Sequence, residues 1–373
     1  MKRLQVNIQD NNDNFYDILI GSGHCKEALV EYIGEQKYKT CILLTNRTVD
    51  HVLAHSVRDM FPKDVRLVNI IIEDGEKFKT LETASFILDQ MFEAGIMRDD
   101  CMFCLGGGVI GDIGGFVASI YLRGIKFVHL PTTVLSMVDS CVGGKTGVNH
   151  TYAKNSIGTF TQPDMVIIDS EFLTMLPKRQ LISGFSEIIK HSLIQDADLF
   201  DSFEGMEAFD FESFVEDFND ILYRSCRIKA DIVEFDEKEK GMRMLLNFGH
   251  TFGHMIETLT SYSVYTHGEA IFAGMEFATY ISHKEGEISR EDFKRVQKVL
   301  LKSGILIELP KVPINIIESI VSKDKKNRAK GIHFIYLERL GKAFVKETSV
   351  EKIVKEFVDF VNEESKLICF AGK

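Results

Sequence analysis

The sequence predicts two domains: an α/β domain with a Rossmann-like, mostly parallel sheet over residues 1–169, and an all-α domain over residues 170–373. Three observations support this division. A chain of 373 residues is longer than one hydrophobic core usually organises. Up to Asp169, short apolar runs alternate with helical patterns, which is typical of parallel sheets crossed by helices. After Asp169, apolar residues recur three or four positions apart, as in helices.

The predicted strands of the first domain are continuous or nearly continuous apolar runs. Such runs are typical of strands that are covered on both faces. Between them lie helical stretches, for example residues 81–93, which end near Gly95. The strands are expected at residues 4–8, 41–45, 67–72, 101–105, 127–130 and 165–168.

Composition excludes several classes of partner and location. With 44 basic and 55 acidic residues the net charge is −11, which disfavours nucleic acid and anionic membranes as partners. No apolar stretch reaches the ~18–20 residues that span a bilayer. Residues 1–12 lack the apolar run of a signal peptide. Seven scattered cysteines indicate reduced thiols, so we expect a cytoplasmic protein, with Cys101 and Cys104 as buried strand positions rather than a redox or zinc pair.

A glycine-rich segment follows the predicted strand 101–105. Residues 106–115 contain six glycines, and Gly106, Gly108 and Gly111 satisfy G-x-G-x-x-G between a strand and a helix. Glycines let the backbone approach a pyrophosphate at a helix N-terminus, although close helix packing also selects them. Nucleotide binding is the favoured interpretation. Because the next strand ends without an acidic residue to hold a ribose, Glu76 is a candidate for that role.

Three histidines suggest a metal site. His250 and His254 are four residues apart, so a helix would present both on one face, and His267 follows. With a carboxylate, such a set suits Zn²⁺. Two histidines at this spacing are also common as surface or core residues, so spacing alone does not decide. The carboxylate would be Glu269 or Glu187, and the spacing does not choose between them.

Several basic residues stand in glycine-rich or apolar contexts, or beside small polar residues. Each alone is by default a solvated charge, but a group of them would bind phosphate and carboxylate through charge-assisted hydrogen bonds. They are Arg123, Lys145, Lys154, Lys190, Lys229, Arg243 and Lys326.

Taken together, these motifs resemble the 3-dehydroquinate synthase family of sugar phosphate cyclases. The resemblance extends from about residue 72 to the 340s and is weaker before that. The segments that carry it are residues 106–115, 121–124, 131–133, 139–149, 158–163, 184–190, 246–254 and 267–269.

The resemblance implies a lyase of the shikimate pathway, which leads to chorismate and the aromatic amino acids. The implied reaction converts 3-deoxy-D-arabino-heptulosonate 7-phosphate to 3-dehydroquinate and phosphate. It proceeds by transient oxidation with NAD, phosphate elimination, re-reduction and intramolecular aldol closure. The resemblance also implies bound NAD, Zn²⁺ with Co²⁺ as the alternative metal, and a homodimer.

Site residues follow from the resemblance, position by position. The implied metal ligands are Glu187, His250 and His267, so His254 would act on the substrate and its phosphate instead. Asn46 stands where the family often has Asp, which weakens it as a ribose anchor. The implied NAD-binding residues are Asn46, Glu76, Lys79, Gly107, Gly108, Asp112, Thr132 and Thr133; the catalytic residues are His254, Lys145, Lys190, Arg243 and Asn247; the substrate-binding residues are Arg123, Asp139, Lys154, Asn155, Lys229 and Lys326.

Three other functions compete with this one. A metal-dependent polyol dehydrogenase would explain the glycines and histidines but not the many cations. A related cyclase, such as one making deoxyinosose, fits residues 143–147 and Arg243 less well. A non-catalytic NAD- or metal-sensing module would not need this complete set of acids, bases and ligands.

Overall fold

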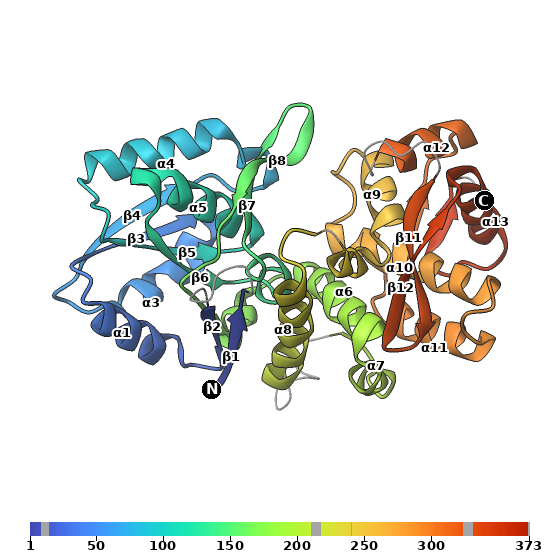
Figure 1. Cartoon of the computed structure of the whole chain (residues 1–373), viewed down its shortest axis with the longest axis horizontal. Helices are drawn as coiled ribbons and strands as arrows, with labels where there is room; N and C mark the ends of the chain where they lie inside the picture. The colour runs from blue at the N-terminus through green and yellow to red at the C-terminus, as the bar shows by residue number, and fades with distance from the viewer. Residues whose placement is uncertain (9–14, 210–217, 240, 324–330, 372–373) are drawn as a thin grey trace. The chain divides into compact units, whose positions relative to one another are not determined.

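The computed structural model describes residues 1–8, 15–209, 218–239, 241–323 and 331–371 (Figure 1). The chain forms two compact units. The first comprises Met1–Pro177 and Glu216–Glu237, and the second comprises Lys178–Val215 and Lys238–Lys373. The division therefore falls after Pro177 rather than after residue 169, and one segment of the C-terminal half returns to the first unit.

The first unit is built on a seven-stranded sheet. The first two strands pair antiparallel, and all other neighbouring strands are parallel. Each of the six predicted strands overlaps a strand of this sheet. In spatial order the strands are β1 (Lys2–Asn7), β2 (Phe15–Gly21), β9 (Met165–Asp169), β6 (Lys126–Pro131), β5 (Cys101–Gly106), β3 (Thr40–Asn46) and β4 (Arg66–Ile72).

Helices cover both faces of this sheet, as the continuous apolar strands predict. Ile87 of one helix and Ile113 of another pack in a single core cluster with side chains of β3, β4 and β5. On the other face, the ring of Phe103 in β5 contacts Tyr32 and Phe61, with centroids 6.4 and 5.2 Å away. Figure 1 shows α4 and α5 on one side of the strands and α1 and α3 on the other. The helices are α1 (Cys25–Gln36), α2 (Arg47–Val49), α3 (His55–Arg58), α4 (Leu81–Glu93), α5 (Gly108–Ile120) and α8 (Phe218–Phe235).

Two parts of the first unit were not predicted, and a third was assigned to the other domain. β2 is almost wholly buried, yet its aspartate and flanking glycine interrupt the apolar run. An antiparallel hairpin, β7 (Lys145–His150) and β8 (Ala153–Phe160), packs against α5 through β7. Helix α8 comes from the C-terminal half of the sequence but packs against β1 and β2.

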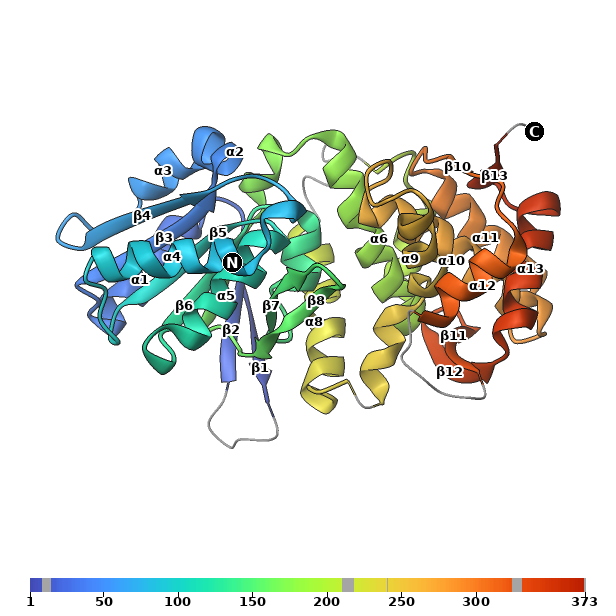
Figure 2. The ribbon, with the colours of Figure 1, turned by 90° about the horizontal axis from the view of Figure 1, so that it is seen from above.

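The second unit is helical, with two small sheets that the sequence pattern did not predict. β10 (Ile307–Leu309) pairs parallel with β13 (Ile368–Phe370), and β11 (Ile332–Arg339) pairs antiparallel with β12 (Lys342–Thr348). Figure 2 shows these two sheets at separate places in the unit. The helices are α6 (Lys178–Gln195), α7 (Ala197–Glu204), α9 (His250–Leu259), α10 (His267–Lys284), α11 (Arg290–Leu301), α12 (Ile314–Lys323) and α13 (Val350–Glu363).

Helix α10 is the centre of the second unit. All its residues from Gly268 to Ser282 are buried, and it packs against α6, α9, α11 and α13. Phe277 on α10 makes edge-to-face contacts with the rings of Phe252, Phe334 and Phe357. The buried stretch includes Gly268 and Glu269 of the first turn of α10, on which the site below depends. Within the described parts of the chain, no helix is both long and apolar enough to cross a bilayer.

Candidate active site

The glycine-rich segment forms the predicted turn from strand to helix. β5 ends at Gly106, Gly107 caps the helix in an extended conformation, and α5 begins at Gly108. The first N–H groups of a helix lack partners within it and carry the positive end of its dipole. The parallel strands β3, β4, β5 and β6 place their carboxyl ends at the same edge, where ligands of such sheets bind.

The two explanations for these glycines apply to different positions. A Cβ on Gly114 would lie 2.4 Å from Sγ of Cys104, so this glycine serves the packing of α5 on β5. A Cβ on Gly108 would lie 3.3 Å from Oγ of Ser140, a contact that small shifts can accommodate. Packing therefore requires a glycine at position 114, within the helix. It does not require one at position 108, where nucleotide binding can explain the glycine.

Polar residues implied for NAD stand at the strand ends. Asn46 ends β3, and its Oδ1 accepts a hydrogen bond from the backbone N–H of Val49 at 2.9 Å. Thr132 and Thr133 follow β6; Thr132 is buried, and Oγ1 of Thr133 accepts the N–H of Ser136 at 3.0 Å. The Asn46 carbonyl oxygen thus already caps a helix, which leaves its NH₂ group for a ligand.

A buried lysine joins residues from two of the implied sets. Lys79 forms an ion pair with Asp112 and donates to Oδ1 of Asn155 at 2.6 Å. Burial raises the pKa of Asp112, and the charge of Lys79 opposes that shift. Glu76 accepts a hydrogen bond from Asn149 at 2.7 Å. The structure therefore brings the implied NAD residues Lys79 and Asp112 into contact with the implied substrate residue Asn155.

The other implied substrate residues of the first unit are in different environments. Lys229, buried on α8, donates to both the carboxylate and the backbone oxygen of Asp139. Lys145 begins β7 and Lys154 lies in β8, and both are exposed. Arg123 follows the C-terminal end of α5, about 20 Å along that helix from the glycine segment. The structure does not gather Arg123 with the residues around the glycine segment.

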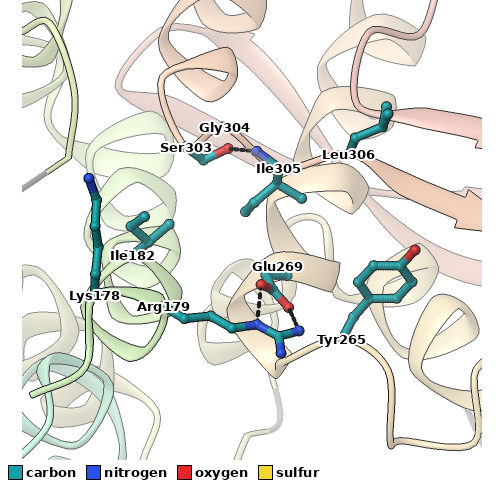
Figure 3. Close-up of a pocket in the computed structure, with 9 residues that line it drawn as sticks. All are labelled: Lys178, Arg179, Ile182, Tyr265, Glu269, Ser303, Gly304, Ile305 and Leu306. Carbon is teal, nitrogen blue, oxygen red and sulfur yellow. Dashed lines mark hydrogen bonds and ion pairs between the residues drawn. The ribbon is translucent and has the colours of Figure 1, made fainter.

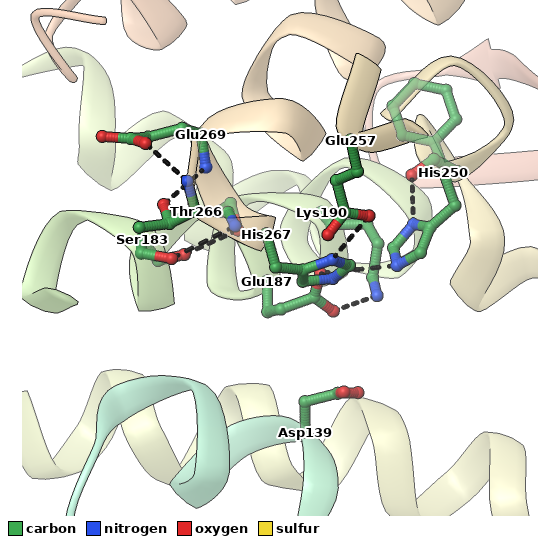
Figure 4. A network of polar contacts seen from close by, with 12 residues as sticks. Asp139, Ser183, Glu187, Lys190, His250, Glu257, Thr266, His267 and Glu269 are labelled. Atoms are coloured by element: carbon green, nitrogen blue, oxygen red, sulfur yellow. Dashed lines mark hydrogen bonds and ion pairs between the residues drawn. The ribbon is translucent and has the colours of Figure 1, made fainter. Parts of the chain in front are cut away.

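In the second unit, Glu187, His250 and His267 converge (Figure 4). Glu187 is fully buried in α6, and the two histidines are the first residues of α9 and α10. Their Nε2 atoms lie 3.7 and 3.9 Å from Oε1 of Glu187. That oxygen is buried and has no hydrogen-bond partner among the described residues, while Lys190 donates to the other one. An unpartnered buried carboxylate oxygen is costly, and a cation would satisfy it.

Both imidazoles are oriented as metal ligands are. Nδ1 of His250 lies 3.2 Å from the carbonyl oxygen of Phe248, so a proton on Nδ1 leaves the Nε2 lone pair free to face the carboxylate. The pKa of His250 is well below its usual value, mainly because the ring is buried. Lys190 and the two neighbouring histidines lower it further, because they disfavour a second positive charge. Nδ1 of His267 lies 3.5 Å from the Glu257 carboxylate. Neutral imidazoles with one carboxylate fit Zn²⁺ or Co²⁺.

The structure separates the two candidate carboxylates. Both oxygens of Glu269 accept hydrogen bonds from Arg179 at 2.7 Å, and one also accepts the N–H of Thr266 at 2.7 Å. The Glu269 carboxylate is thus already occupied by Arg179 and the helix cap. Geometry places Glu187, and not Glu269, with the histidines.

His254 lies one turn after His250 on α9. Its ring centroid is 5.4 Å from that of His250 and 6.2 Å from that of His267. Ligand atoms of His254, Glu257 and His267 also lie within 4.8 Å of one another. The two groups share His267, and the group with the unpartnered Glu187 oxygen is the better fit for an ion.

Four further residues are implied for the second unit, and two of them, Arg243 and Asn247, shortly precede His250 in the sequence. Lys190 and Arg243 are buried. Asn247 ends a short 3₁₀ helix, η7 (Met242–Asn247), and donates to Oε1 of Glu239 at 3.2 Å. Lys326 lies outside the described residues.

Glu257 is a site residue that the sequence reasoning missed, although a signal was present. It follows His250 by seven residues and His254 by three, which places all three side chains on one face of α9. Asn149 and Glu239 carried no such signal, because each is identified only by the side chain that it contacts.

The sequence is similar to that of known proteins over almost its whole length. Residues 69–183 match the family model described as 3-dehydroquinate synthase N-terminal, and residues 184–327 match 3-dehydroquinate synthase C-terminal. The 3-dehydroquinate synthase of Acinetobacter baylyi is 39% identical over 361 residues, which cover 95% of this chain and 97% of the relative. The chain belongs to the 3-dehydroquinate synthase family.

Its activity is that of a 3-dehydroquinate synthase, a carbon–oxygen lyase. Two solved structures of other cyclases share the fold. A 2-deoxy-scyllo-inosose synthase complexed with carbaglucose-6-phosphate, NAD⁺ and Co²⁺ has a TM-score of 0.85 and 25% identity, covering 96% of this chain and 99% of its own. The 2-epi-5-epi-valiolone synthase of Streptomyces hygroscopicus subsp. jinggangensis 5008, with NAD⁺ and Zn²⁺ bound, has a TM-score of 0.82 and 26% identity, covering 94% and 97%.

These comparisons confirm the predicted family, activity and fold class. They favour 3-dehydroquinate synthase over a cyclase that makes deoxyinosose. The 3-dehydroquinate synthase of Acinetobacter baylyi shares 39% of its residues with this chain, whereas the structures of the two other cyclases share about a quarter. The roles of individual residues are a separate question.

Proposed function

We propose that this 3-dehydroquinate synthase acts on 3-deoxy-D-arabino-heptulosonate 7-phosphate with bound NAD and one divalent metal ion. The observation that carries the proposal is the buried Oε1 of Glu187, which faces two imidazole nitrogens and has no hydrogen-bond partner among the described residues. A cluster of this kind has no purpose in packing. It matches the metal chemistry that the reaction requires.

Glu187, His250 and His267 would hold the metal. Three protein ligands, rather than four, are typical of catalytic zinc, which keeps a position for substrate. When bound, the ion supplies Lewis acidity that makes a substrate hydroxyl easier to oxidise. Lys190 holds one oxygen of Glu187 and thereby directs the other toward the imidazoles.

NAD would bind at the glycine segment, over the N-terminus of α5. When bound, it supplies a hydride acceptor that also returns the hydride within one turnover. Gly107 and Gly108 would admit the pyrophosphate, and Asn46, Glu76, Thr132 and Thr133 would bind the riboses and nicotinamide end from the strand edges. Lys79 and Asp112 neutralise each other, so they would orient groups by hydrogen bonds rather than add net charge.

Basic residues would bind the two anionic groups of the substrate. A phosphate and a carboxylate together need several cationic donors, and charge-assisted hydrogen bonds fix their orientation. His254, beside the metal cluster, would act on the phosphate and its proton. The remaining residues proposed for substrate are Arg123, Asp139, Lys145, Lys154, Asn155, Lys190, Lys229, Arg243, Asn247 and Lys326.

We also propose that the protein is a cytoplasmic homodimer without nucleic-acid or membrane partners. The resemblance supports the dimer, and the net charge of −11 disfavours polyanions. Seven free cysteines, six of them buried, suit a reducing compartment.

One assay tests the reaction. The purified protein is incubated with the heptulosonate phosphate, a trace of NAD⁺ and Zn²⁺, and phosphate, dehydroquinate and NADH are followed. Phosphate and dehydroquinate should appear in equal amounts with no net NADH. Accumulating NADH would indicate a dehydrogenase, and no phosphate release with metal supplied would contradict the synthase mechanism.

A further inference from the structure

One face of α6 holds three consecutive residues of α10. Arg179, Ser183 and Glu187 follow each other at four-residue intervals, so they lie along one face of α6. Arg179 binds Glu269, Ser183 accepts the backbone N–H of residue 268 at 3.1 Å, and Glu187 faces His267. Figure 4 shows Ser183 and Glu187 beside this first turn of α10.

The Arg179 contact is the most elaborate of the three (Figure 3). Nε and Nη2 of Arg179 donate to the two oxygens of Glu269, each at 2.7 Å, and Nη2 also donates to the carbonyl oxygen of Val264 at 2.7 Å. Glu269 in turn accepts the N–H of Thr266, and Oγ1 of Thr266 accepts the N–H of Glu269, which completes a capping box. The guanidinium therefore ties the end of the preceding loop to the first turn of α10.

The backbones of the two helices approach so closely that little adjustment is available. A Cβ on Gly268 would lie 1.9 Å from the carbonyl oxygen of Ser183, so only glycine fits. His267 precedes this glycine and is the first residue of α10, where a helix frays unless it is capped. The position of its imidazole thus depends on how firmly the turn of residues 266–269 is held.

We propose that Arg179 is a positioning residue for the metal ligand His267, acting through Glu269 and the cap of α10. This inference rests on the proposed metal site at Glu187, His250 and His267. Groups that orient a ligand without touching the metal typically change metal affinity about 10- to 100-fold when they are removed. Arg179 does so by fixing the backbone from which the imidazole projects.

A purely structural salt bridge would behave differently. The Arg179 side chain is 57% exposed, and ion pairs at such sites contribute little to global stability. Its removal should therefore affect the local turn more than the folding of the unit. Metal affinity, rather than the melting temperature, is the quantity that separates the two roles.

Arg295 offers a matched control in the same unit. Its Nε and Nη2 donate to the two oxygens of Glu204 at 3.0 and 2.6 Å, a pair of the same bidentate type on α11 and α7. Neither helix carries a residue of the proposed metal site. Arg295 also pairs with Asp201 and Asp292, so its removal costs at least as many ion pairs without changing the first turn of α10.

The test is zinc titration of the metal-free full-length protein, with a chelating dye as competitor. Arg179→Ala should weaken zinc binding about tenfold or more, while Arg295→Ala should bind as the wild type does. Equal zinc affinity for Arg179→Ala and the wild type, or equal losses in both variants, would overturn the proposal. A wild-type protein that binds no zinc would instead contradict the metal site itself.

Two further measurements show whether Arg179 acts through Glu269. The double variant Arg179→Ala/Glu269→Ala should bind zinc no more weakly than Glu269→Ala alone, because both changes break one connection. With Co²⁺ in place of zinc, Arg179→Ala should alter the visible absorption bands that report ligand geometry, and Arg295→Ala should not. Additive losses in the double variant, or a cobalt spectrum unchanged by Arg179→Ala, would overturn the proposed route.

The surroundings of Arg179 also permit chemical rescue. Its guanidinium borders a pocket of about 460 Å³, lined by Lys178, Ile182, Tyr265 and residues 303–306. Added methylguanidinium should therefore enter the space left in Arg179→Ala and restore part of the zinc affinity. The same additive should leave Glu269→Ala unchanged, and equal effects on both variants would count against the proposal.

Discussion

Lys190 donates a hydrogen bond to one carboxylate oxygen of Glu187 and leaves the other directed at two imidazoles. The two residues are three apart on α6 and almost completely buried. A buried carboxylate with a single lysine partner satisfies only part of its hydrogen-bonding capacity. The pair therefore fixes the direction of the remaining oxygen and supports the proposed metal ligand set.

The first prediction concerns His250. His250→Ala removes one of three proposed ligands, so bound zinc and dehydroquinate formation should both fall by at least two orders of magnitude. The sheet of the first unit should remain folded, because His250 belongs to the second unit. Metal content by atomic emission and circular dichroism measure the two effects.

His283→Ala provides the matched control for this experiment. His283 lies at the other end of α10, where it stacks on Phe293 and bonds to the Ile288 carbonyl. The His283→Ala variant should retain zinc and activity. Unchanged zinc content in His250→Ala would refute the ligand assignment.

The second prediction separates two glycines of α5. Gly108→Ala places a methyl group where the pyrophosphate should approach, so NAD affinity should fall about tenfold or more with little change in melting temperature. Gly114→Ala forces a methyl group to within 2.4 Å of Cys104 Sγ and should destabilise the fold, by about 1–3 kcal/mol. Calorimetric NAD binding and thermal melts distinguish the two variants. Equal NAD affinity in Gly108→Ala and the wild type would exclude the proposed cofactor position.

The third prediction concerns Lys145. Lys145 is exposed at the start of β7, so Lys145→Ala should fold normally. Substrate KM should rise about tenfold or more while NAD affinity changes little. Lys126→Ala, an exposed lysine at the start of β6, should leave both unchanged. Equal weakening of substrate and NAD in Lys145→Ala would argue against a specific role in substrate binding.

Sequence reasoning found the elements whose signals are local. β3, β5 and β6 are continuous apolar runs, and the turn at Gly106–Gly108 follows from its composition. β2 was missed because Asp17 interrupts its pattern; that aspartate is nevertheless buried, paired with Arg3 on the neighbouring strand. The return of α8 to the first unit depends on packing between distant segments, which periodicity does not encode.

In the candidate site, too, features with a local sequence signal were predicted, and contacts between distant segments were not. The histidine spacing indicated a metal site but did not choose between Glu187 and Glu269; the family resemblance implied Glu187, and the path of α6 brings that residue to the histidines. Arg179 gave no signal at all in the sequence, because its importance lies in the turn that it holds 90 residues away. Spacing within a helix is predictable, and contacts between helices are not.

The last prediction uses His129, which lies under the helix of the glycine segment. It is buried in β6, with its ring 3.2 Å from the position of a Cβ on Gly111, and burial lowers its pKa to about 4. In the unfolded chain a histidine titrates near 6.5. Between pH 6.5 and 4 the imidazole is protonated in the unfolded chain but not in the native protein. His129 should therefore lower the unfolding free energy as the pH falls through this range, by about 3 kcal/mol in total. Above pH 6.5 this effect disappears.

An NMR titration checks the sign and the cause. The His129 ring signal, assigned by its absence in His129→Gln, should not shift between pH 7.5 and 5. Over the same range, denaturant unfolding of the wild type should lose stability more steeply than that of His129→Gln, whose side chain does not titrate. A His129 signal that titrates near pH 6.5 would mean that the ring is solvated in the native state. The core beneath the glycine segment would then be open to water, contrary to the packing of β6 against α5.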